Sequence, residues 1–528
     1  MPADVYFTTN PAEFTRLEGL YVTERDPPGF IRGRDLSITG MFGRTVRGPT
    51  TPQVITSTGR FVEVYGGRDQ GGVGQPATNE IWKALVNKPF GTLVIRRVVA
   101  QGTTSATLAS VTLDNAADGT GTNILRVDAT SLGAWGNGVG FKIEDASDGD
   151  VNKFNLVVRY LGSETRYENL DTRAGTDNLL AVIGDDVANF LTVTKLADGR
   201  PINSAAITEV TYVAARDTDD FVTLGESSLA ATYSQVSGSE GVLEATDYIA
   251  ALTDVASVQG PGVVLCPESL EDTVGATSQA TLNAAIVTQA ATVHDRIFLT
   301  WSGICGLTPA QEISALTAQI TTRSDRIVWA YNCPRTLDPS TATKFATGPH
   351  IWMASIFSQN DVDVHPGAQE AGAQTAGIAE LATETLTRGD LIALRDAGIS
   401  TLEKLPGQFL FRSGVTTSLI TGRTEVTRRR MADFLQLSAA DRLRFFVKAK
   451  NTLELRAQIV GELTAFSQSL RDQGRVVEEF ELEQESVNTP AQRAQGVEKL
   501  LWRVRLLGHI LHLVLETEIG TGVVIEAE

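Results

Sequence analysis

The sequence predicts a multidomain protein that combines α/β and α+β domains. Its 528 residues are enough for roughly three or four domains, each with its own core. Residues 236–400 alternate apolar strand patterns with helical patterns, as in an α/β protein with a parallel sheet. Residues 452–517 give a long helix, an acidic strand, a short helix signal and an alternating strand pair, which predicts an α+β domain.

The first 100 residues predict three strands and a helix. Residues 1–20 are polar and poor in core pattern, typical of an arm that orders only against a partner. An alternating strand covers residues 20–24, and a second lies within LSITGMFGRTVRG (36–48). A helix is expected at 79–87, followed by a buried strand in GTLVIRRVV (91–99).

Thr, Ser, Ala, Gly and Asp dominate from about residue 101 to 235. The alternation in FKIED (141–145) and FNLVVRY (154–160), with turn residues between them, predicts a β-rich inserted domain.

The α/β region alternates helices and apolar runs. Helices are expected at 247–258 and 281–296. Short apolar runs, spaced like strands of a parallel sheet, are VVLC (263–266), IFLTWSG (297–303), RIVWAYNC (326–333) and HIWMASIF (350–357).

Residues after 420 predict the C-terminal α+β domain. Ser438 and Asp441 have the spacing of a capping box that opens a helix. A second helix runs from near Thr452 to Gly474. The segments that follow are the strand VVEEFELEQES (476–486), the helix start Asn488-Thr489-Pro490 and the alternating strand pair 497–519.

Several of these segments carry motifs that resemble those of contractile tail sheath proteins, found in phage tails, R-type bacteriocins and related injection systems. The matching residues are Gly19, Tyr21, Val22 and Glu24; Gly43, Gly48 and Pro49; Phe61, Tyr65 and Gly66 in a glycine turn; Arg97 and Val98; LGAWGN with FNLVV and ENL in 132–170; LRDAGI (394–399); and EVTRRRMADF (425–434), where family strands pass into a helix. Two departures are that Ser400 follows Ile399 where the family commonly has Asn, and that FLFRSGVTT replaces a WGxRT string.

The resemblance implies a sheath C-terminal α+β domain, built with an N-terminal segment, a β-rich insertion and an α/β domain of subtilisin-like fold. The implied boundaries are 1–24 for an N-terminal arm, 25–100 for the N-terminal part of the core, 101–235 for the insertion, 236–395 for the α/β domain, 396–516 for the C-terminal domain and 517–528 for a C-terminal arm.

Composition excludes several functions. The 63 acidic and 45 basic residues give a net charge of −18, which argues against nucleic-acid binding, although it also serves solubility. No signal-peptide pattern or apolar run of membrane-spanning length is present, so no membrane insertion is expected. Cys266, Cys305 and Cys333 form no CxxC pair, which predicts a reducing compartment, the cytoplasm, at synthesis.

Candidate enzyme and metal chemistry is sparse. None of the five histidines, His294, His350, His365, His509 and His512, accompanies a G-x-S-x-G elbow, so we expect no enzyme activity. Asp361, Asp363 and His365 alternate and would share a face on a strand, where they could bind a divalent cation. A polar strand end before the Pro366-Gly367 turn is the alternative, and we expect no metal or cofactor.

Two charged segments are better candidates for a function. Residues 423–450 form a basic block in an acidic protein, through Arg428, Arg429 and Arg430 together with Arg442, Arg444, Lys448 and Lys450. Glu479, Glu481 and Glu483 share one face of a strand. These opposed patches could align one subunit with the next, or with an inner tube, by charge complementarity. The alternative is two solvated faces, because exposed ion pairs contribute only ~0–1 kcal/mol each.

The tail carries a β-prone segment, GVVIE, after a glycine. An unpaired strand of this kind would be a sticky edge, whereas donation to a neighbouring sheet would satisfy its backbone. By resemblance, Leu20, Tyr21, Val22 and Glu24 and the tail from Thr517, with Val523, Val524 and Ile525, are arms exchanged between subunits. The alternative is a strand that closes its own domain.

The resemblance implies a structural subunit that polymerises as stacked hexameric rings around a tail tube and contracts to drive the tube through the target cell envelope. Implied partners are further copies of the chain, a tail tube protein, and baseplate and tail terminator proteins. The implied location is the virion, assembled in the bacterial host cytoplasm; phage, bacteriocin and injection system stay open. An α/β hydrolase and a non-contractile self-assembling scaffold are the alternatives.

Overall fold

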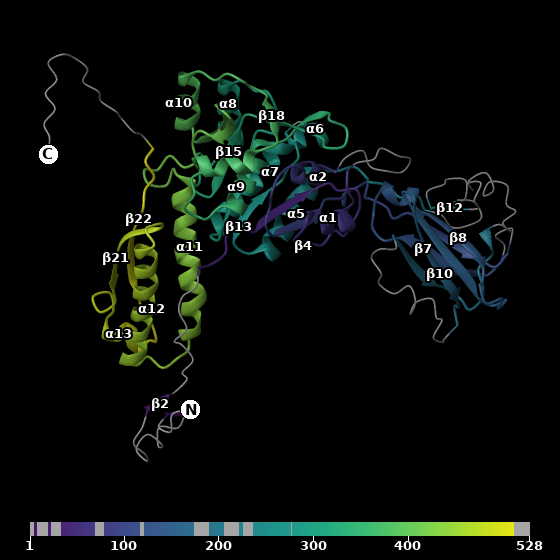
Figure 1. Cartoon of the computed structure of the whole chain (residues 1–528), viewed down its shortest axis with the longest axis horizontal. Helices are drawn as coiled ribbons and strands as arrows, with labels where there is room; N and C mark the ends of the chain where they lie inside the picture. The colour runs from purple at the N-terminus through teal and green to yellow at the C-terminus, as the bar shows by residue number, and fades with distance from the viewer. Residues whose placement is uncertain are drawn as a thin grey trace. The chain divides into compact units, whose positions relative to one another are not determined.

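The computed structural model describes residues 5–7, 20–22, 33–68, 79–116, 121–173, 190–204, 221–224, 236–275 and 277–511 (Figure 1). The chain forms two compact units. The larger unit is Asp35–Asp433, and the smaller one combines Met1–Arg34 with Phe434–Glu528. Within the part described, no helix is long and apolar enough to cross a membrane.

The larger unit is built on an eight-stranded sheet of order β20-β19-β15-β14-β13-β3-β5-β4. The six strands from β19 to β5 are parallel, and β20 and β4 are antiparallel edges. This confirms the predicted α/β sheet and adds strands from the first 100 residues to it. The strands are β3 Thr39–Gly43, β4 Gln53–Ile55, β5 Leu93–Arg97, β13 Gly262–Leu265, β14 Arg296–Thr300, β15 Ile327–Tyr331, β19 Ile399–Leu405 and β20 Gln408–Phe411.

Both faces of this sheet are buried, which explains the continuous apolar runs in its strands. Along β13, Val263 and Leu265 join the core of one face, while Val264 joins the core of the other. The first core includes residues of α1 Thr58–Tyr65, α2 Glu80–Leu85 and α9 Pro349–Gln359. The second includes residues of α5 Ala245–Gln259, α6 Leu270–Thr273, α7 Ser278–Thr292, α8 Pro309–Gln319 and α10 Arg388–Asp396.

Two segments differ from their predicted structure. HIWMASIF forms α9 rather than a strand; the helix starts at Pro349, and its residues are buried on all sides. An apolar run without periodicity cannot distinguish a buried helix from a buried strand. The expected glycine turn at Phe61–Gly66 is the end of α1, which Ser57 caps by accepting a hydrogen bond from the Arg60 N–H.

A small antiparallel sheet, of order β17-β16-β18, also belongs to the larger unit. Its strands are β16 Pro334–Leu337, β17 Lys344–Ala346 and β18 Ile378–Leu381, and a 3₁₀ helix, η6, covers Gln369–Thr375.

Residues 106–239 contain the predicted β-rich region. A four-stranded sheet, β10-β9-β8-β12, and a three-stranded sheet, β11-β7-β6, share one apolar core around the buried Trp135. Nothing in the structure tests the predicted boundaries themselves. The elements are β6 Ser110–Asp114, β7 Asn123–Ala129, η2 Ala134–Gly138, β8 Gly140–Asp145, β9 Phe154–Tyr160, β10 Ser163–Leu170, β11 Leu191–Lys195 and β12 Val222–Thr223.

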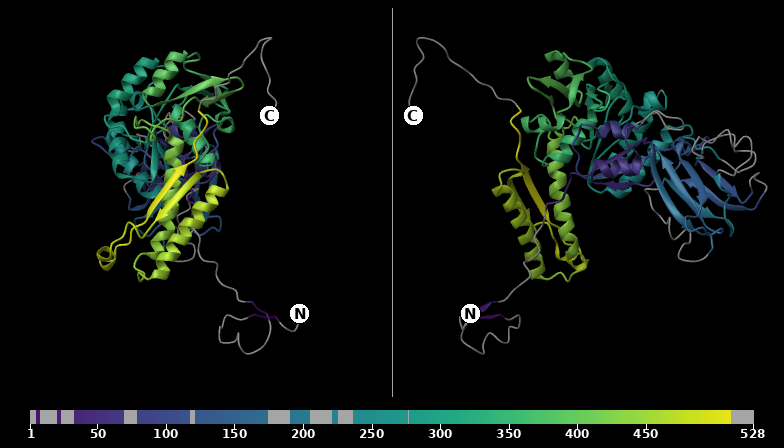
Figure 2. Two further views of the ribbon diagram at one scale, coloured as in Figure 1. Left: turned by 90° about the vertical axis from the view of Figure 1, so that its left-hand side faces the viewer. Right: turned by 45° about the vertical axis from the view of Figure 1, so that its right-hand side comes forward.

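The smaller unit contains a helix packed on two strands (Figure 2). Thr452 caps its long helix, which ends before Gly474 at φ +64°, as predicted. The predicted second strand of the 497–519 pair falls in residues 507–511, which are irregular, and beyond the described residues. The elements are β1 Val5–Phe7, β2 Leu20–Val22, the end of α11 Val426–Leu443, η7 Arg444–Phe446, α12 Leu453–Asp472, β21 Val477–Glu483, α13 Pro490–Ala494 and β22 Leu501–Leu506.

The predicted capping box at Ser438 and Asp441 is wrong, because both residues lie inside α11. Their polar groups instead bind the N-terminal segment. The Arg34 N–H donates to Ser438 Oγ at 2.8 Å, and Arg34 Nη1 pairs with Asp441 Oδ2 at 2.5 Å. The family-like strand expected at EVTRRRMADF is likewise the start of α11.

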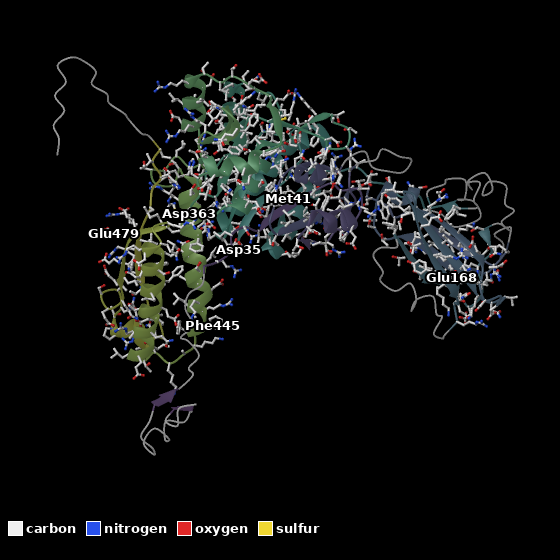
Figure 3. The ribbon with its side chains drawn as sticks, in the orientation of Figure 1. Asp35, Met41, Glu168, Asp363, Phe445 and Glu479 are labelled. Carbon is white, nitrogen blue, oxygen red and sulfur yellow. A yellow bond between two sulfur atoms is a disulfide. The ribbon has the colours of Figure 1, made fainter. Side chains whose placement is uncertain are left out.

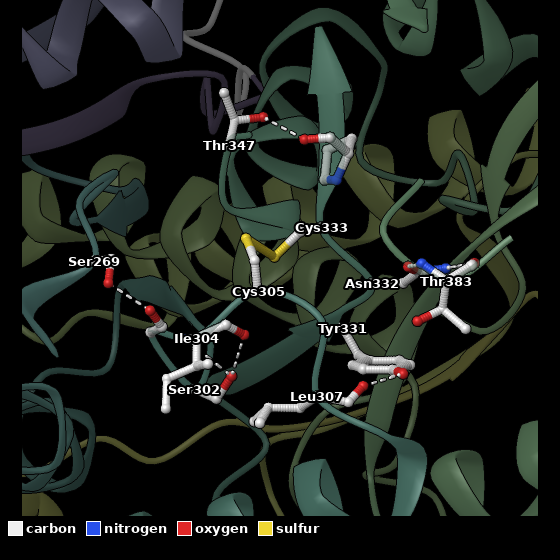
Figure 4. Close-up of a disulfide and its surroundings, with 12 residues drawn as sticks. Ser269, Ser302, Ile304, Cys305, Leu307, Tyr331, Asn332, Cys333, Thr347 and Thr383 are labelled. Carbon is white, nitrogen blue, oxygen red and sulfur yellow. Dashed lines mark hydrogen bonds between the residues drawn. A yellow bond between two sulfur atoms is a disulfide. The ribbon is translucent and has the colours of Figure 1, made fainter. Parts of the chain in front are cut away.

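Cys305 and Cys333 form a disulfide, with their Cα atoms 5.6 Å apart (Figure 4). Cys305 follows β14 and Cys333 follows β15, so adjacent parallel strands bring together cysteines 28 positions apart. The bond does not fit the predicted reducing compartment at synthesis. Cys266 is free and buried.

Glu312 makes the larger unit sensitive to pH. Its buried carboxylate accepts hydrogen bonds from Trp329 Nε1 (2.7 Å) and Ser302 Oγ (3.0 Å), and burial raises its pKa to about 7. Because the folded-state pKa exceeds the unfolded one, the stability due to this group is full below about pH 4.5 and is lost as the pH rises through about 7.

We therefore expect Glu312→Gln to raise the thermal unfolding midpoint at pH 8 and to change it little at pH 5, because the amide is neutral at both values. Thermal unfolding by circular dichroism measures this, with Glu384→Gln on the exposed surface as the control. The same shift at both pH values would contradict the account.

Candidate assembly surfaces

The acidic strand predicted from the sequence is β21, and its carboxylates are paired within the chain. In the antiparallel register Glu479 lies opposite Arg505, and Glu481 lies opposite Arg503. Arg505 Nη1 is 3.0 Å from Glu479 Oε2, and Arg503 Nη1 is 2.9 Å from Glu481 Oε2 and also pairs with Glu483. Since Glu479, Glu481 and both arginines are more than half exposed, water screens these pairs and they stabilise the strand pair only weakly.

The other face of this strand pair packs on α12. Trp502 lies on β22 opposite Leu482 of β21. Its Nε1 donates to Ser467 Oγ at 3.1 Å, and its ring centroid lies 6.4 Å from that of Phe466. The sheet thus has an apolar face that a helix covers and a charged face that is exposed. Glu479, on the charged face, is labelled in Figure 3.

The β21–β22 sheet has two strands within the residues that the structure describes, and each strand has one neighbour there. An isolated pair of strands is marginally stable in water. Its outer edges carry backbone N–H and C=O groups that can accept a further strand. The sheet is therefore suited to extension by another segment.

The basic triplet does not form one surface. Successive residues of a helix are about 100° apart, so three in a row cannot share a face. Arg428 is 42% exposed and pairs with Glu425 at 3.1 Å. Arg429 pairs with Asp433 at 2.6 Å, and the buried Arg430 donates to Phe357 O at 2.9 Å. The side chains of Arg429 and Arg430 thus make contacts within the larger unit, and their role at an interface stays a prediction.

The candidate metal residues lie in a turn after α9, not on a strand. Arg430 Nη1 donates to Asp361 O at 3.4 Å. Burial lowers the pKa of Arg430 to about 10, and the charges of Asp363 and Asp361 oppose this shift. His365 Nδ1 accepts from the Gly367 N–H at 2.9 Å. Among the residues described, no group of three or more His, Cys, Asp or Glu could hold a metal ion.

His350, a candidate for catalysis, is a residue of the core. Its Nε2 is 2.8 Å from Cys266 O, and its ring is stacked on Trp301 with centroids 5.7 Å apart. Burial lowers its pKa to about 4, so the imidazole is neutral at physiological pH. Ser302, which follows β14, donates a hydrogen bond from its Oγ to Glu312 Oε2 at 3.0 Å.

The connection between α11 and α12 forms an exposed surface that contains the last part of the predicted basic block. Phe445, Val447 and Leu453 are 65%, 68% and 73% exposed. We name this surface the basic tip; it comprises Arg444, Phe445, Val447, Lys448, Lys450 and Leu453. Lys448 and Lys450 make no ion pair with described residues. The arginines of β22, Arg503 and Arg505, do form ion pairs. Exposed apolar groups with unpaired positive charges are typical of a protein interaction site.

A bidentate ion pair supports the basic tip. Arg442 Nε and Nη2 lie 2.8 and 2.9 Å from the two oxygens of Glu462, which joins α11 to α12. The sequence signal for the basic tip is the basic block at 423–450. The capping box expected at Ser438 and Asp441 places the residues of the tip in a helix, and so it hides the exposed connection. Figure 3 labels Phe445 on this connection.

The predicted arms are described only in part. The backbone of Leu20, Tyr21 and Val22 pairs in parallel with Val5–Phe7 of the same chain. Glu24, Val523, Val524 and Ile525 lie outside the described residues. Their pairing with a neighbouring subunit is therefore untested.

No family model and no curated protein matches the chain. Solved structures do match it over nearly its whole length. A sheath tail protein from Desulfitobacterium hafniense is 15% identical with a TM-score of 0.57, over 93% of this chain and 100% of that one. A sheath tail protein from Listeria innocua is 10% identical with a TM-score of 0.57, over 91% and 97%.

The helical sheath of the anti-feeding prophage in its contracted state is also similar, with 10% identity and a TM-score of 0.53 over 96% of this chain and 99% of that one. At these identities the likeness establishes the fold, and it includes both units of the chain. The chain has the fold of the contractile tail sheath proteins that its sequence motifs resemble.

Proposed function

We propose that this protein is the structural subunit of a contractile tail sheath. The observation that carries the proposal is the smaller unit, which contains both chain termini and a two-stranded sheet with unpaired outer edges among the described residues. The likeness to a helical sheath over almost the whole chain supports the same function.

Polymerisation follows from the sheet edges. An identical head-to-tail contact repeated between subunits builds a helix when the rotation does not close a ring. A donated strand satisfies the edge of a neighbouring sheet through backbone hydrogen bonds. The donors are the N-terminal arm, with Leu20, Tyr21, Val22 and Glu24, and the C-terminal arm, with Val523, Val524 and Ile525.

Contraction requires subunits that move as rigid bodies while remaining connected. The eight-stranded sheet, buried on both faces, makes the larger unit suitable as such a body. Stacked hexameric rings assemble around a tail tube in an extended state that is kinetically trapped. Collapse to the shorter state drives the tube through the target cell envelope.

The charged surfaces provide contacts to partners. The basic tip binds an acidic surface of the tube protein, and the paired face of Glu479, Glu481 and Glu483 aligns neighbouring subunits together with the exposed Arg428. Baseplate and tail terminator proteins bind the ends of the polymer. The particle is assembled in the cytoplasm of a bacterial host and becomes part of a virion or a related injection particle.

Breaking the C-terminal arm tests strand exchange. We expect Val524→Pro to abolish polymerisation while the monomer stays folded, because proline removes a backbone donor from the strand. Negative-stain electron microscopy and circular dichroism measure the two properties. Val524→Thr, which keeps a β-branched side chain, is the matched control and should form tubes. Normal tubes from Val524→Pro would contradict strand exchange by this arm.

Charge reversal in the basic tip tests the contact with the tube. We expect Arg444→Glu with Lys450→Glu to lower co-sedimentation with the tube protein by about tenfold or more, since each reversed charge turns attraction into repulsion. Self-polymerisation should persist. Lys404→Glu with Lys344→Glu, exposed in the larger unit, is the control with the same change in net charge. Equal losses in both double variants would show a net-charge effect instead of a specific contact.

A further inference from the structure

Lys88 is a buried cation with no carboxylate partner among the residues that the structure describes. It follows α2 and is 8% exposed. Its Nζ lies 3.9 Å from the centroid of the Trp352 ring and donates to Val86 O at 3.3 Å. Burial lowers its pKa to about 7, and no nearby carboxylate opposes the shift. A buried charge usually requires a partner of opposite sign.

Four of the five buried arginines of the described chain meet this requirement with an ion pair, and Arg430 meets it only through the charges of nearby aspartates. The four ion pairs are 2.8–3.3 Å long. The pairs are Arg96 with Asp254, Arg97 with Glu240, Arg296 with Asp295 and Arg326 with Asp433, and the aspartates near Arg430 are Asp361 and Asp363. Lys88 has neither an ion pair among the described residues nor an acidic group that influences its pKa, and in this it differs from the five arginines.

A cavity of about 320 Å³ adjoins Lys88. Three consecutive hydroxyl side chains, Thr56, Ser57 and Thr58, also line it, and none of its described lining residues is acidic. Thr58 is the first residue of α1, whose first turn contains no acidic side chain. The partial positive charge of a helix N-terminus thus lies at the same cavity as the side chain of Lys88.

We infer that this cavity binds a small oxyanion, such as a phosphate or a carboxylate group, with Lys88 as its charge partner. Charge-assisted hydrogen bonds from the ammonium group and hydrogen bonds from the three hydroxyls suit an acceptor with several oxygens. The N-terminus of α1 favours the same sign of ligand. A bound oxyanion gives Lys88 the counter-charge that the described residues do not provide.

Isothermal titration of the full-length chain with inorganic phosphate tests the site. We expect Lys88→Met to weaken phosphate binding by about tenfold or more, because a hydrogen bond to a charged group contributes ~1.5–3 kcal/mol. Methionine keeps an apolar stem against Trp352. Lys83→Met is the matched control, since Lys83 lies on α2 and pairs with Glu80 at 2.9 Å; it should bind as the unchanged protein does.

Chemical labelling of the unchanged protein gives a second measurement that does not depend on the folding of a variant. Acetylation with an N-hydroxysuccinimide ester, read by peptide mass spectrometry, should be slower at Lys88 in the presence of phosphate and unchanged at Lys83. A parallel titration with acetate identifies the source of the oxyanion. Tighter phosphate binding indicates a phosphate-bearing ligand, and tighter acetate binding indicates a carboxylate-bearing ligand.

The inference is overturned if neither probe binds, or if Lys88→Met binds both probes as tightly as the unchanged protein does. Acetylation of Lys88 that is insensitive to both probes would overturn it as well.

Discussion

The parallel pairing of β3 with β13 is the interaction on which the rest of the larger unit depends. It places Thr39 beside Val263 and Met41 beside Leu265, and so joins segments more than 200 positions apart. Once this pairing closes the sheet, the β-rich region between β5 and α5 must leave the sheet and return to it. The segments before residue 35 and after residue 433 are then left to form the smaller unit. Both termini therefore belong to the unit whose β21–β22 sheet has two strands among the described residues.

Charge is used differently in the two units. Buried arginines of the larger unit are held by aspartates and glutamates, as in the pair of Arg326 with Asp433, which ties the start of α11 to the sheet. Such pairs fix one geometry, because a buried charge left alone is costly. In the smaller unit the pairs along β21 and β22 are exposed and weak, so they can exchange partners at little cost. The buried pairs suit a larger unit that moves as a rigid body. The exposed pairs suit a smaller unit whose surface contacts change.

Much of the fold could be predicted from the sequence, because local signals agreed with the tertiary structure. Thr452 and Gly474 mark the ends of α12, and the apolar runs of β13, β14 and β15 mark a buried sheet. Prediction failed where tertiary contacts override a local signal. HIWMASIF is buried on every side, so it has no periodicity, and Ser438 binds the backbone of Arg34 instead of capping a helix.

The candidate site was less predictable for the same reason. The alternation of Glu479, Glu481 and Glu483 indicated an exposed face, but the arginines opposite them depend on strand register. Arg429 and Arg430 are indistinguishable from Arg428 in a sequence, and only packing buries them. The cavity at Lys88 and the disulfide of Cys305 with Cys333 join residues from separate segments, so no local pattern predicts either.

The central claim is that the chain polymerises by itself into a sheath, and negative-stain electron microscopy of the purified, overexpressed protein tests it most directly. We predict hollow tubes with regular striations, because the proposed arms of each subunit complete the sheet of its neighbour. Dispersed monomers, even at high concentration and with a tube protein added, would contradict it.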